Sequence, residues 1–248
     1  MTTAFIDADI LVYEAAFRAE TTIEWEPGDA SSYASLEQAQ VDFMQTVASV
    51  TRLAGCDANK LTLTTCARED NFRHHLWPTY KENRKDGRRP VLHAALREWV
   101  LEEYAPVHKP NIEADDVLGI LATKYPGNVI VSIDKDLDTV PGLHYNWRKP
   151  ELGVYDVTPE EAAWNHLYQT LVGDSTDGFP GCRGIGPKRA VVVLNGQPLD
   201  DGKGLWSCVV EAFEKKGLSE EEALVQARCA YILQRDDYID GEVQLWTP

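Results

Sequence analysis

The sequence lacks long apolar runs, paired cysteine motifs and a basic leader. No hydrophobic run approaches the roughly 18 residues of a membrane-spanning helix, so no membrane span is expected. The five cysteines are odd in number and form no CxxC pattern, which supports neither a disulfide framework nor a zinc site. The N-terminus has no basic segment before its apolar run, so we expect a core strand and not a signal peptide. These features predict a protein of a reducing cytosol.

Basic residues are also scarce. The chain has 24 Lys and Arg against 40 Asp and Glu, for a net charge of −16. This total alone argues against nucleic acid as a partner, because backbone binding depends on Lys and Arg. The distribution is uneven, however, with nine basic and four acidic residues in 60–97, but two basic and ten acidic residues in 1–59. A basic stretch facing an acidic site could hold a polyanion, and a solvated charged face is the alternative interpretation.

Strand and helix patterns alternate along the chain. They predict strands at 3–8, 60–65, 128–133 and 143–147, and helices at 11–17, 35–54, 91–104, 112–125 and 158–173. The polar, basic residues 67–90 are broken by proline and glycine and are expected to be flexible or partly helical. This alternation is typical of an α/β fold with a mostly parallel sheet. The length of 248 residues fits one large domain, or a main domain with a small attachment.

Acidic residues gather where strands end or helices begin. They are Asp7 and Asp9 in FIDAD, Glu113, Asp115 and Asp116 in IEADD, Asp134, Asp136 and Asp138 in SIDKDLD, and Asp174 and Asp177 in GDSTD. Ligands bind at the carboxyl ends of parallel strands, so these groups can meet there. Carboxylates so close together repel one another unless hard cations lie between them, and oxygen-only ligands favour Mg²⁺ or Mn²⁺. Such sites usually handle phosphate esters. Simple helix capping is the alternative for residues 113–116.

A glycine-rich turn follows the last acidic group. GIGPKRA (184–190) enters a helix after tight turns, and backbone N–H groups at such a turn bind phosphate without reading bases. Lys188 and Arg189 add positive charge there.

Taken in order, these motifs resemble the 5′ nuclease (flap endonuclease) family, and most of all its T-seven-type phage 5′→3′ exonucleases. YKENRK (80–85) resembles the family's arch segment, and EADDVLGI, SIDKDLDT and GDSTDGF followed by GIGPKRA match its later blocks in order. The resemblance runs from the first strand to YIDGEVQLW. It implies a PIN-like, mostly parallel sheet flanked by helices, with a helical arch and a helix-hairpin-helix element. The implied division is a nuclease core at 1–157 with the arch at 67–105, a DNA-binding region at 158–215, and a helix and strand at 216–248 that pack back on the core.

The resemblance also implies a role for each site residue. The first metal cluster would be Asp7, Glu113, Asp115, Asp134 and Asp136, and the second metal or its water shell would use Asp116, Asp174 and Asp177. Lys81 and Arg84 would act on the scissile phosphate. DNA contacts would come from Arg73, Tyr80, Lys85, Gly184, Gly186, Lys188 and Arg189. Core packing is the alternative to base stacking for Tyr80.

The implied activity is two-metal-ion hydrolysis of double-stranded DNA from a 5′ end or flap. Two Mg²⁺ or Mn²⁺ ions would serve it, with K⁺ at the glycine turn. RNA–DNA hybrids would be a further substrate, through primer removal in phage DNA replication within the host bacterial cytoplasm.

One position departs from the family pattern. The family usually carries an Asp at the end of the strand before the arch, and Cys66 stands at or near that place. Glu69 and Asp70 are candidates to replace it. Asp9 is another candidate to compensate in part. The alternative is that Asp9 is a surface residue without a partner.

Two rival functions remain at the level of sequence. A haloacid-dehalogenase-type phosphatase is suggested by IDADIL and GDSTD, although it leaves the IEADD and SIDKDLD groups unexplained. A catalytically impaired DNA-structure binder is the second rival, if Cys66 marks the loss of a metal ligand.

Overall fold

The centre of the molecule is a mostly parallel sheet, as the sequence predicts. A computed structural model describes residues 1–26, 29–83, 88–195 and 203–248. Within them, a five-stranded sheet has the order β4-β1-β5-β6-β7, with β7 antiparallel to β6 and the other neighbours parallel. Its strands are β1 (Thr3–Asp7), β4 (Ala58–Thr62), β5 (Val129–Val131), β6 (Gly142–Tyr145) and β7 (Val154–Val157).

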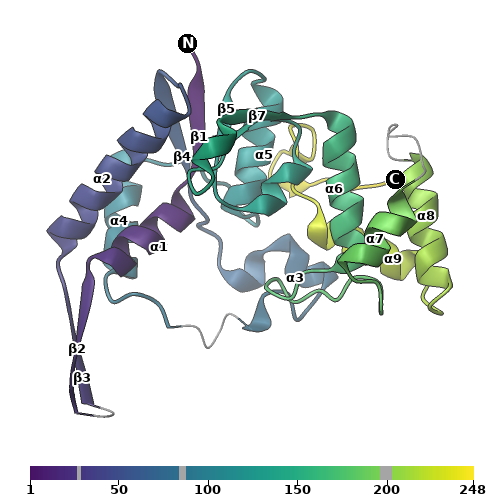
Figure 1. Cartoon of the computed structure of the whole chain (residues 1–248), viewed down its shortest axis with the longest axis horizontal. Coiled ribbons are helices and arrows are strands. Elements are labelled where there is room, and N and C mark those ends of the chain that lie inside the picture. Colours follow the sequence, from purple (N-terminus) through teal and green to yellow (C-terminus); the bar gives the residue numbers. More distant parts are fainter. Residues whose placement is uncertain (27–28, 84–87, 196–202) are drawn as a thin grey trace.

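Helices surround this sheet and continue beyond it. They are α1 (Ala8–Arg18), α2 (Leu36–Leu53), α3 (Phe72–Leu76), α4 (His93–Tyr104), α5 (Ala114–Lys124), α6 (Pro159–Val172), α7 (Pro187–Leu194), α8 (Lys203–Glu214) and α9 (Glu220–Ala230). Two hairpins are formed by β2 (Glu20–Glu26) with β3 (Asp29–Ala34), and by β8 (Tyr238–Ile239) with β9 (Glu242–Val243). Figure 1 shows the β2–β3 hairpin projecting at one end of the molecule and α6 to α9 gathered at the other. Within the described residues, no helix combines the length and apolar character needed to cross a membrane.

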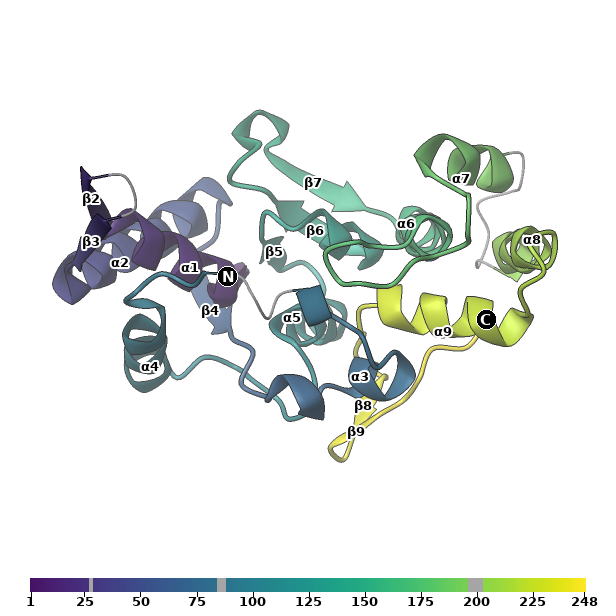
Figure 2. The same cartoon turned by 90° about the horizontal axis from the view of Figure 1, so that it is seen from below.

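The two faces of the sheet are covered by different helices. Side chains alternate between the faces of a strand, and in β1 Ala4 and Ile6 belong to a core with α1, α2 and α4. Phe5, between them, packs on the opposite face with Leu118 of α5. Figure 2 shows α1, α2 and α4 apart from α5, with the sheet between. The chain passes from the carboxyl end of β1 straight into α1, so the start of α1 lies at that edge of the sheet.

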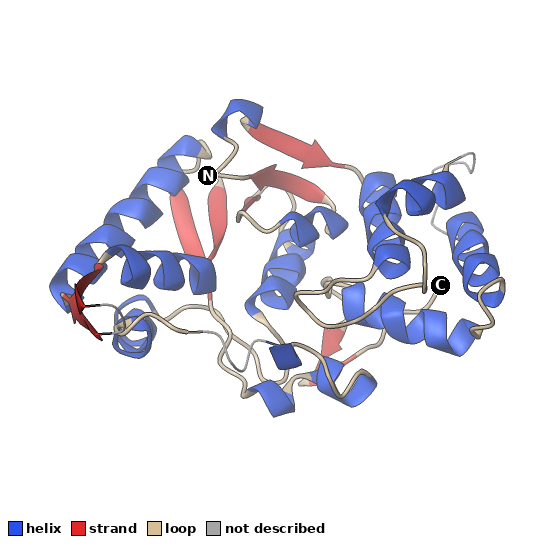
Figure 3. Ribbon diagram, turned by 60° about the horizontal axis from the view of Figure 1, so that its bottom comes forward, coloured by secondary structure: helices blue, strands red, loops and turns tan. Residues whose placement is uncertain are grey.

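A second apolar core holds α6 to α9 together. It includes Leu171, Leu205 and Phe213, and Trp246 from the C-terminal segment packs with its ring centroid 5.3 Å from that of Trp206. Figure 3 shows α6 to α9 as a helical group beside the sheet. After α9 the chain returns to α5, where a Cβ on Gly119 would lie 2.4 Å from the Leu233 carbonyl oxygen. Only glycine allows this close approach, so α5 and the segment after α9 fit together tightly.

Several elements differ from the sequence expectation. The strand expected at 60–65 occupies Ala58–Thr62, and the β2–β3 hairpin, β7 and α8 were not predicted. In the segment 67–90 the partly helical alternative holds for the described residues, with a 3₁₀ turn at Arg68–Asp70 followed by α3. Phe72, Arg73 and Tyr80 of this segment are buried, which ties it to the body of the protein.

Candidate active site

A cavity of about 1220 Å³ opens at the carboxyl ends of β1 and β5. The acidic groups expected to meet do line this one cavity. They are Asp7, Asp9, Glu113, Asp115, Asp134, Asp136, Asp174 and Asp177. Since they come from four distant stretches of sequence, the fold brings together nearly the whole predicted acidic set.

Asp7 and Asp134 are placed by turns at the ends of two neighbouring strands. Asp7 is the last residue of β1, and its Oδ1 accepts the N–H of Asp9 at 3.0 Å, which starts α1. Asp134 follows β5 and accepts the N–H of Asp136 at 2.9 Å. The Ser132 hydroxyl lies between them, 3.4 Å from Asp7 Oδ2, and accepts the Asp134 N–H at 3.1 Å. Both carboxylates are therefore fixed by capping and also face the cavity.

The start of α5 is anchored through Thr64. The Thr64 hydroxyl accepts the N–H of Ala114 at 2.9 Å, and the Thr64 N–H is donated to Asp9 Oδ2 at 3.0 Å. This contact gives Asp9 a defined partner, so the surface alternative for Asp9 is wrong. It also links the start of α5 to the start of α1 through Thr64, with Glu113 and Asp115 on the cavity wall.

A tight glycine loop presents Asp174 and Asp177. Asp174 Oδ1 accepts the N–H groups of Thr176 at 2.6 Å and Asp177 at 3.0 Å. Gly173 has a φ of 73°, and a Cβ there would lie 2.5 Å from the nitrogen of Gly181. A larger residue at either glycine would open the loop, because the two backbone segments touch.

Burial and mutual repulsion raise the pKa of several of these carboxyl groups. The pKa of Asp7 rises to about 7, through burial first and then through Asp9 and Asp134. The pKa of Asp136 also rises to about 7, through burial, Asp134 and Asp174. Burial, Asp7 and Asp134 raise the pKa of Asp115 well above its usual value. The cavity wall thus carries more negative charge than its protein neighbours neutralise, and a bound cation would relieve this.

The donor set suits a hard divalent cation. Carboxylate oxygens dominate the wall, and the buried Oε1 of Gln169 on α6, also on the wall, has no hydrogen-bond partner among the described residues. In the same described ranges, no three His, Cys, Asp or Glu side chains are already gathered as a metal cage.

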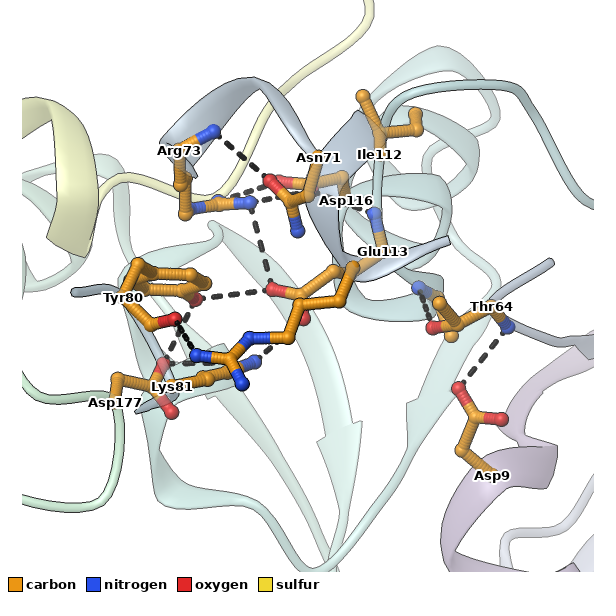
Figure 4. A network of polar contacts seen from close by, with 12 residues as sticks. Asp9, Thr64, Asn71, Arg73, Tyr80, Lys81, Ile112, Glu113, Asp116 and Asp177 are labelled. Carbon is orange, nitrogen blue, oxygen red and sulfur yellow. Dashed lines mark hydrogen bonds and ion pairs between the residues drawn. The ribbon is translucent and has the colours of Figure 1, made fainter. Parts of the chain in front are cut away.

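Asp116 faces away from the cavity. It is fully buried, and its two oxygens accept hydrogen bonds from the Arg73 guanidinium, each at 2.7 Å. The Leu233 N–H is donated to Asp116 at 3.2 Å, and Asp116 also caps the N–H of Glu113 at 3.1 Å. Figure 4 shows this pair above the Glu113 carboxylate. The capping alternative therefore holds for Asp116, and its carboxylate contacts protein groups in place of the expected metal.

Arg73 has protein partners in place of the expected DNA. Its side chain is 4% exposed, and it also donates to the carbonyl oxygens of Cys229 at 3.1 Å and Tyr231 at 2.6 Å. Arg73 therefore joins α3 and α5 to the end of α9 and the segment after it.

Tyr80 and Lys81 lie against the acidic wall. The Tyr80 ring is buried with Phe179 and Ala230, so the core-packing alternative matches its position, and its hydroxyl lies 3.0 Å from Glu113 Oε2 and 2.9 Å from Asp177 Oδ2. Lys81 Nζ donates to Glu113 Oε1 at 2.6 Å (Figure 4). Burial alone would raise the pKa of Glu113, but Lys81 and Arg73 lower it to about 2. The expected phosphate and DNA contacts Arg84 and Lys85 lie outside the described residues.

Cys66 lines the cavity where the family pattern predicts an Asp. Its thiol donates to the Ile112 carbonyl oxygen at 3.2 Å, and its pKa rises to about 11 through burial and Glu113. Glu69 and Asp70 are exposed on the 3₁₀ turn, so neither of these two candidates replaces the family's Asp on the wall. Asp9 does lie on that wall.

The predicted helix-hairpin-helix residues lie on the helical end of the molecule. Gly184 and Gly186 precede α7, and Lys188 and Arg189 are exposed in its first turn. Arg189 donates to the Gly184 carbonyl oxygen at 2.9 Å, which closes the turn.

Sequence reasoning missed a group of basic residues at the start of α4 and just before it. Arg89, His93 and Arg97 line the acidic cavity. His93 and Arg97 are four residues apart on one face of α4, and Arg89 precedes the helix. That spacing was a usable signal, because the region had already been recognised as basic.

Comparisons with known proteins agree with this geometry. A family model described as the 5′–3′ exonuclease N-terminal resolvase-like domain matches residues 2–148. The exodeoxyribonuclease of Enterobacteria phage T3 is 30% identical over 98% of this chain and 92% of its own length. The exonuclease of Escherichia phage T7 is 29% identical with the same coverage.

Among solved structures, a bacteriophage T5 flap endonuclease in complex with DNA and metal ions superposes with a TM-score of 0.60. It is 16% identical, over 92% of this chain and 88% of the other. The match supports the fold, and the phosphatase alternative is wrong, because the matched family spans the IDADIL and SIDKDLD groups together. By its sequence matches, the chain belongs to the 5′–3′ exonuclease family.

Proposed function

We propose that this protein is a divalent-metal-dependent 5′→3′ nuclease that hydrolyses phosphodiester bonds of double-stranded DNA from a 5′ end or flap. The observation that carries the proposal is the convergence of eight carboxylates from four chain segments on one cavity. Family membership supports the direction of attack and the substrate class.

Mg²⁺ or Mn²⁺ is the cofactor that the oxygen ligands favour. Asp7, Glu113, Asp115, Asp134 and Asp136 would hold one ion, and Asp174 and Asp177 a second. Bound there, the ions would supply Lewis-acid charge at the scissile phosphate and at the attacking water. Asp116 is left out of this set because both of its oxygens are bonded to Arg73.

The chain's own cations would act on the substrate phosphates. Lys81 lies on the wall beside Glu113, while Arg97 on α4 and Arg89 just before that helix line the same cavity. Positive groups fixed near the reacting phosphate stabilise the charge that develops on its oxygens. Arg84 would join them from the arch.

The duplex would be held away from the cavity, at the turn before α7. Exposed backbone N–H groups near Gly184 and Gly186, with Lys188 and Arg189, suit phosphate binding without base reading. We assign this role to the region 158–215, with K⁺ as a further ligand of the turn. RNA–DNA hybrids, as in primer removal, are a second substrate to test.

The first test is cleavage of a 5′-labelled duplex and a 5′-flap duplex by wild type and Asp134→Asn, in Mg²⁺ or EDTA. Metal-dependent cleavage from the 5′ end that is lost in the variant would support the proposal, and product lengths would separate exonuclease from flap cutting. Asp156→Asn is the matched control, because Asp156 is exposed on β7, away from the acidic wall. Cleavage that persists in EDTA would contradict the proposal.

A DNA-structure binder without cleavage is the second candidate. Cys66 favours it, since a thiol stands on the wall where the family pattern predicts a carboxylate. Duplex binding without cleavage in either Mg²⁺ or Mn²⁺ would identify this function.

A further inference from the structure

The segment 77–83 is docked on the loop 174–178. Three hydrogen bonds join them, from Trp77 Nε1 to the Gly178 carbonyl at 2.9 Å, from Lys81 N–H to the Asp177 carbonyl at 2.7 Å, and from Asn83 Nδ2 to the Ser175 carbonyl at 2.7 Å. Lys81 has a φ of 53°, in the left-handed region that non-glycine residues rarely adopt. The docking contacts hold this unfavourable conformation, so the position of Lys81 is imposed by its surroundings.

Two carboxylates meet at this docking point. Glu113 comes from the start of α5 and Asp177 from the glycine loop, and each side chain is only 16% exposed. The Tyr80 hydroxyl lies within hydrogen-bond distance of both, but it has one proton to donate. Tyr80 can therefore donate its proton to only one of these two carboxylates at a time.

The Lys81 ammonium supplies the missing positive charge. Its Nζ lies 2.6 Å from Glu113 Oε1 and 3.6 Å from Asp177 Oδ2, and its side chain is 13% exposed. A nearly buried ammonium between two carboxylates has the charge and the position of a cation bound to them. Both carboxylates belong to the acidic wall.

We propose that Lys81 is the internal counter-cation of the metal-free site, and that a divalent cation displaces its ammonium from Glu113 and Asp177. The divalent cation rests on the proposed function. What is new is that Lys81 and this ion compete for the same two carboxylates. Tyr80 is a positioning residue that keeps the two carboxylates together in both states. Once displaced, Lys81 is available to a substrate phosphate, so metal binding prepares the substrate contact.

The competition is tested by direct Mn²⁺ binding, measured as the loss of the free-ion electron paramagnetic resonance signal. In Lys81→Met no ammonium has to be displaced, so Mn²⁺ should bind about tenfold more tightly than in wild type. Lys81→Arg keeps the charge and should show no such gain. Lys135→Met is the matched control, because Lys135 lines the same cavity but is 81% exposed and 4.0 Å from Asp136. It should change Mn²⁺ affinity less than about twofold.

A second readout separates displacement from a general structural effect. Lys81→Met should bind Mn²⁺ more tightly yet cleave more slowly at saturating metal, since the contact to the substrate phosphate is lost. A merely structural role would weaken both together. In EDTA the variant should also melt at a lower temperature than wild type, with the deficit removed by Mn²⁺.

The outcomes distinguish this inference from the function on which it rests. Mn²⁺ binding by wild type with unchanged or weaker affinity in Lys81→Met would overturn the competition and leave the nuclease proposal standing. Wild type that binds no Mn²⁺ would overturn both. Tyr80→Phe keeps Lys81 in place, so tighter Mn²⁺ binding in that variant would also count against the ammonium as the competitor.

Discussion

Asp115 and Asp116 are neighbours in the first turn of α5, and their carboxylates lie in opposite environments. Asp116 is enclosed by Arg73 and the Leu233 N–H, with each partner in hydrogen-bond geometry. Asp115 lies on the cavity wall, where burial, Asp7 and Asp134 raise its pKa. The same residue type is thus satisfied by the protein on one side of the helix and left for a ligand on the other. Substitution of Asp116 is therefore expected to lower mainly stability, and substitution of Asp115 mainly cleavage activity.

The largest effect on folding is expected from Asp116→Asn. An uncharged partner removes the carboxylate that holds the buried Arg73 guanidinium at two points and leaves it the more distant Glu113, at 3.6 Å. Breaking such a buried pair costs about 3–5 kcal/mol of unfolding free energy. Urea denaturation measures the loss. The double variant Arg73→Met/Asp116→Leu should recover much of it, because an apolar pair of similar volume needs no counter-charge. A loss below about 1 kcal/mol would show that water reaches the pair.

Asp115→Asn should have the opposite profile. Cleavage should fall about a hundredfold or more, because a metal ligand is lost from the reacting site. In EDTA the variant should be as stable as wild type or more so, since the repulsion from Asp7 and Asp134 is removed. Rate assays in Mg²⁺ and melting curves in EDTA measure the two effects. Strong destabilisation of the metal-free variant would mean that Asp115 has a structural partner after all.

The smallest effect is a pH dependence of the metal-free protein. The pKa of Asp136 is about 7 in the folded protein and 3.8 by its ordinary value. Because folding raises this pKa, the contribution of Asp136 to the free energy of unfolding is fully present below pH 3.8. It is lost as pH rises towards 7. Asp136→Asn removes this loss, so relative to wild type in EDTA it should gain about 1–2 kcal/mol at pH 8 and little at pH 5.

The comparison of Asp136→Asn with wild type isolates Asp136 from other titrating groups. The buried His166 has its pKa lowered to about 4 by burial, so its contribution is lost as pH falls below its ordinary value of 6.5, in the opposite direction. It is present in both proteins and cancels. Adding Mn²⁺ at pH 8 should reverse the order, making wild type the more stable. An equal pH profile for both proteins in EDTA would contradict the repulsion described for the acidic wall.

Local sequence patterns were enough to predict the sheet and most of the acidic wall. Asp7 and Asp134 follow short apolar strands, and parallel strands bring their carboxyl ends together whatever lies between them in sequence. The β2–β3 hairpin was missed because its polar strands, ETTIEWE and DASSYA, lack the apolar period on which the other assignments relied, although Pro27 and Gly28 were a turn signal.

The different environments of Asp115 and Asp116 on α5 could not be predicted from sequence. Whether Asp115 or Asp116 faces the cavity depends on the rotation of the helix and on a partner, Arg73, that lies 43 residues earlier. The burial of Tyr80 and the left-handed backbone of Lys81 likewise depend on the loop 174–178, almost a hundred residues later. Such contacts are set by tertiary packing, which no local pattern encodes. The roles of the individual site residues and the division into domains stay predictions.

The end of α9 and the segment after it have a consequence for the order in which the protein matures. Arg73 is held by the carbonyl oxygens of Cys229 and Tyr231, and Ala230 and Ile232 form part of the cavity wall. The ribosome makes this segment more than two hundred residues after β1. A nascent chain can therefore build its sheet and most of its acidic residues early, but the cavity is closed only when this late segment arrives. A nuclease assembled in this way acquires its finished site near the end of its own synthesis.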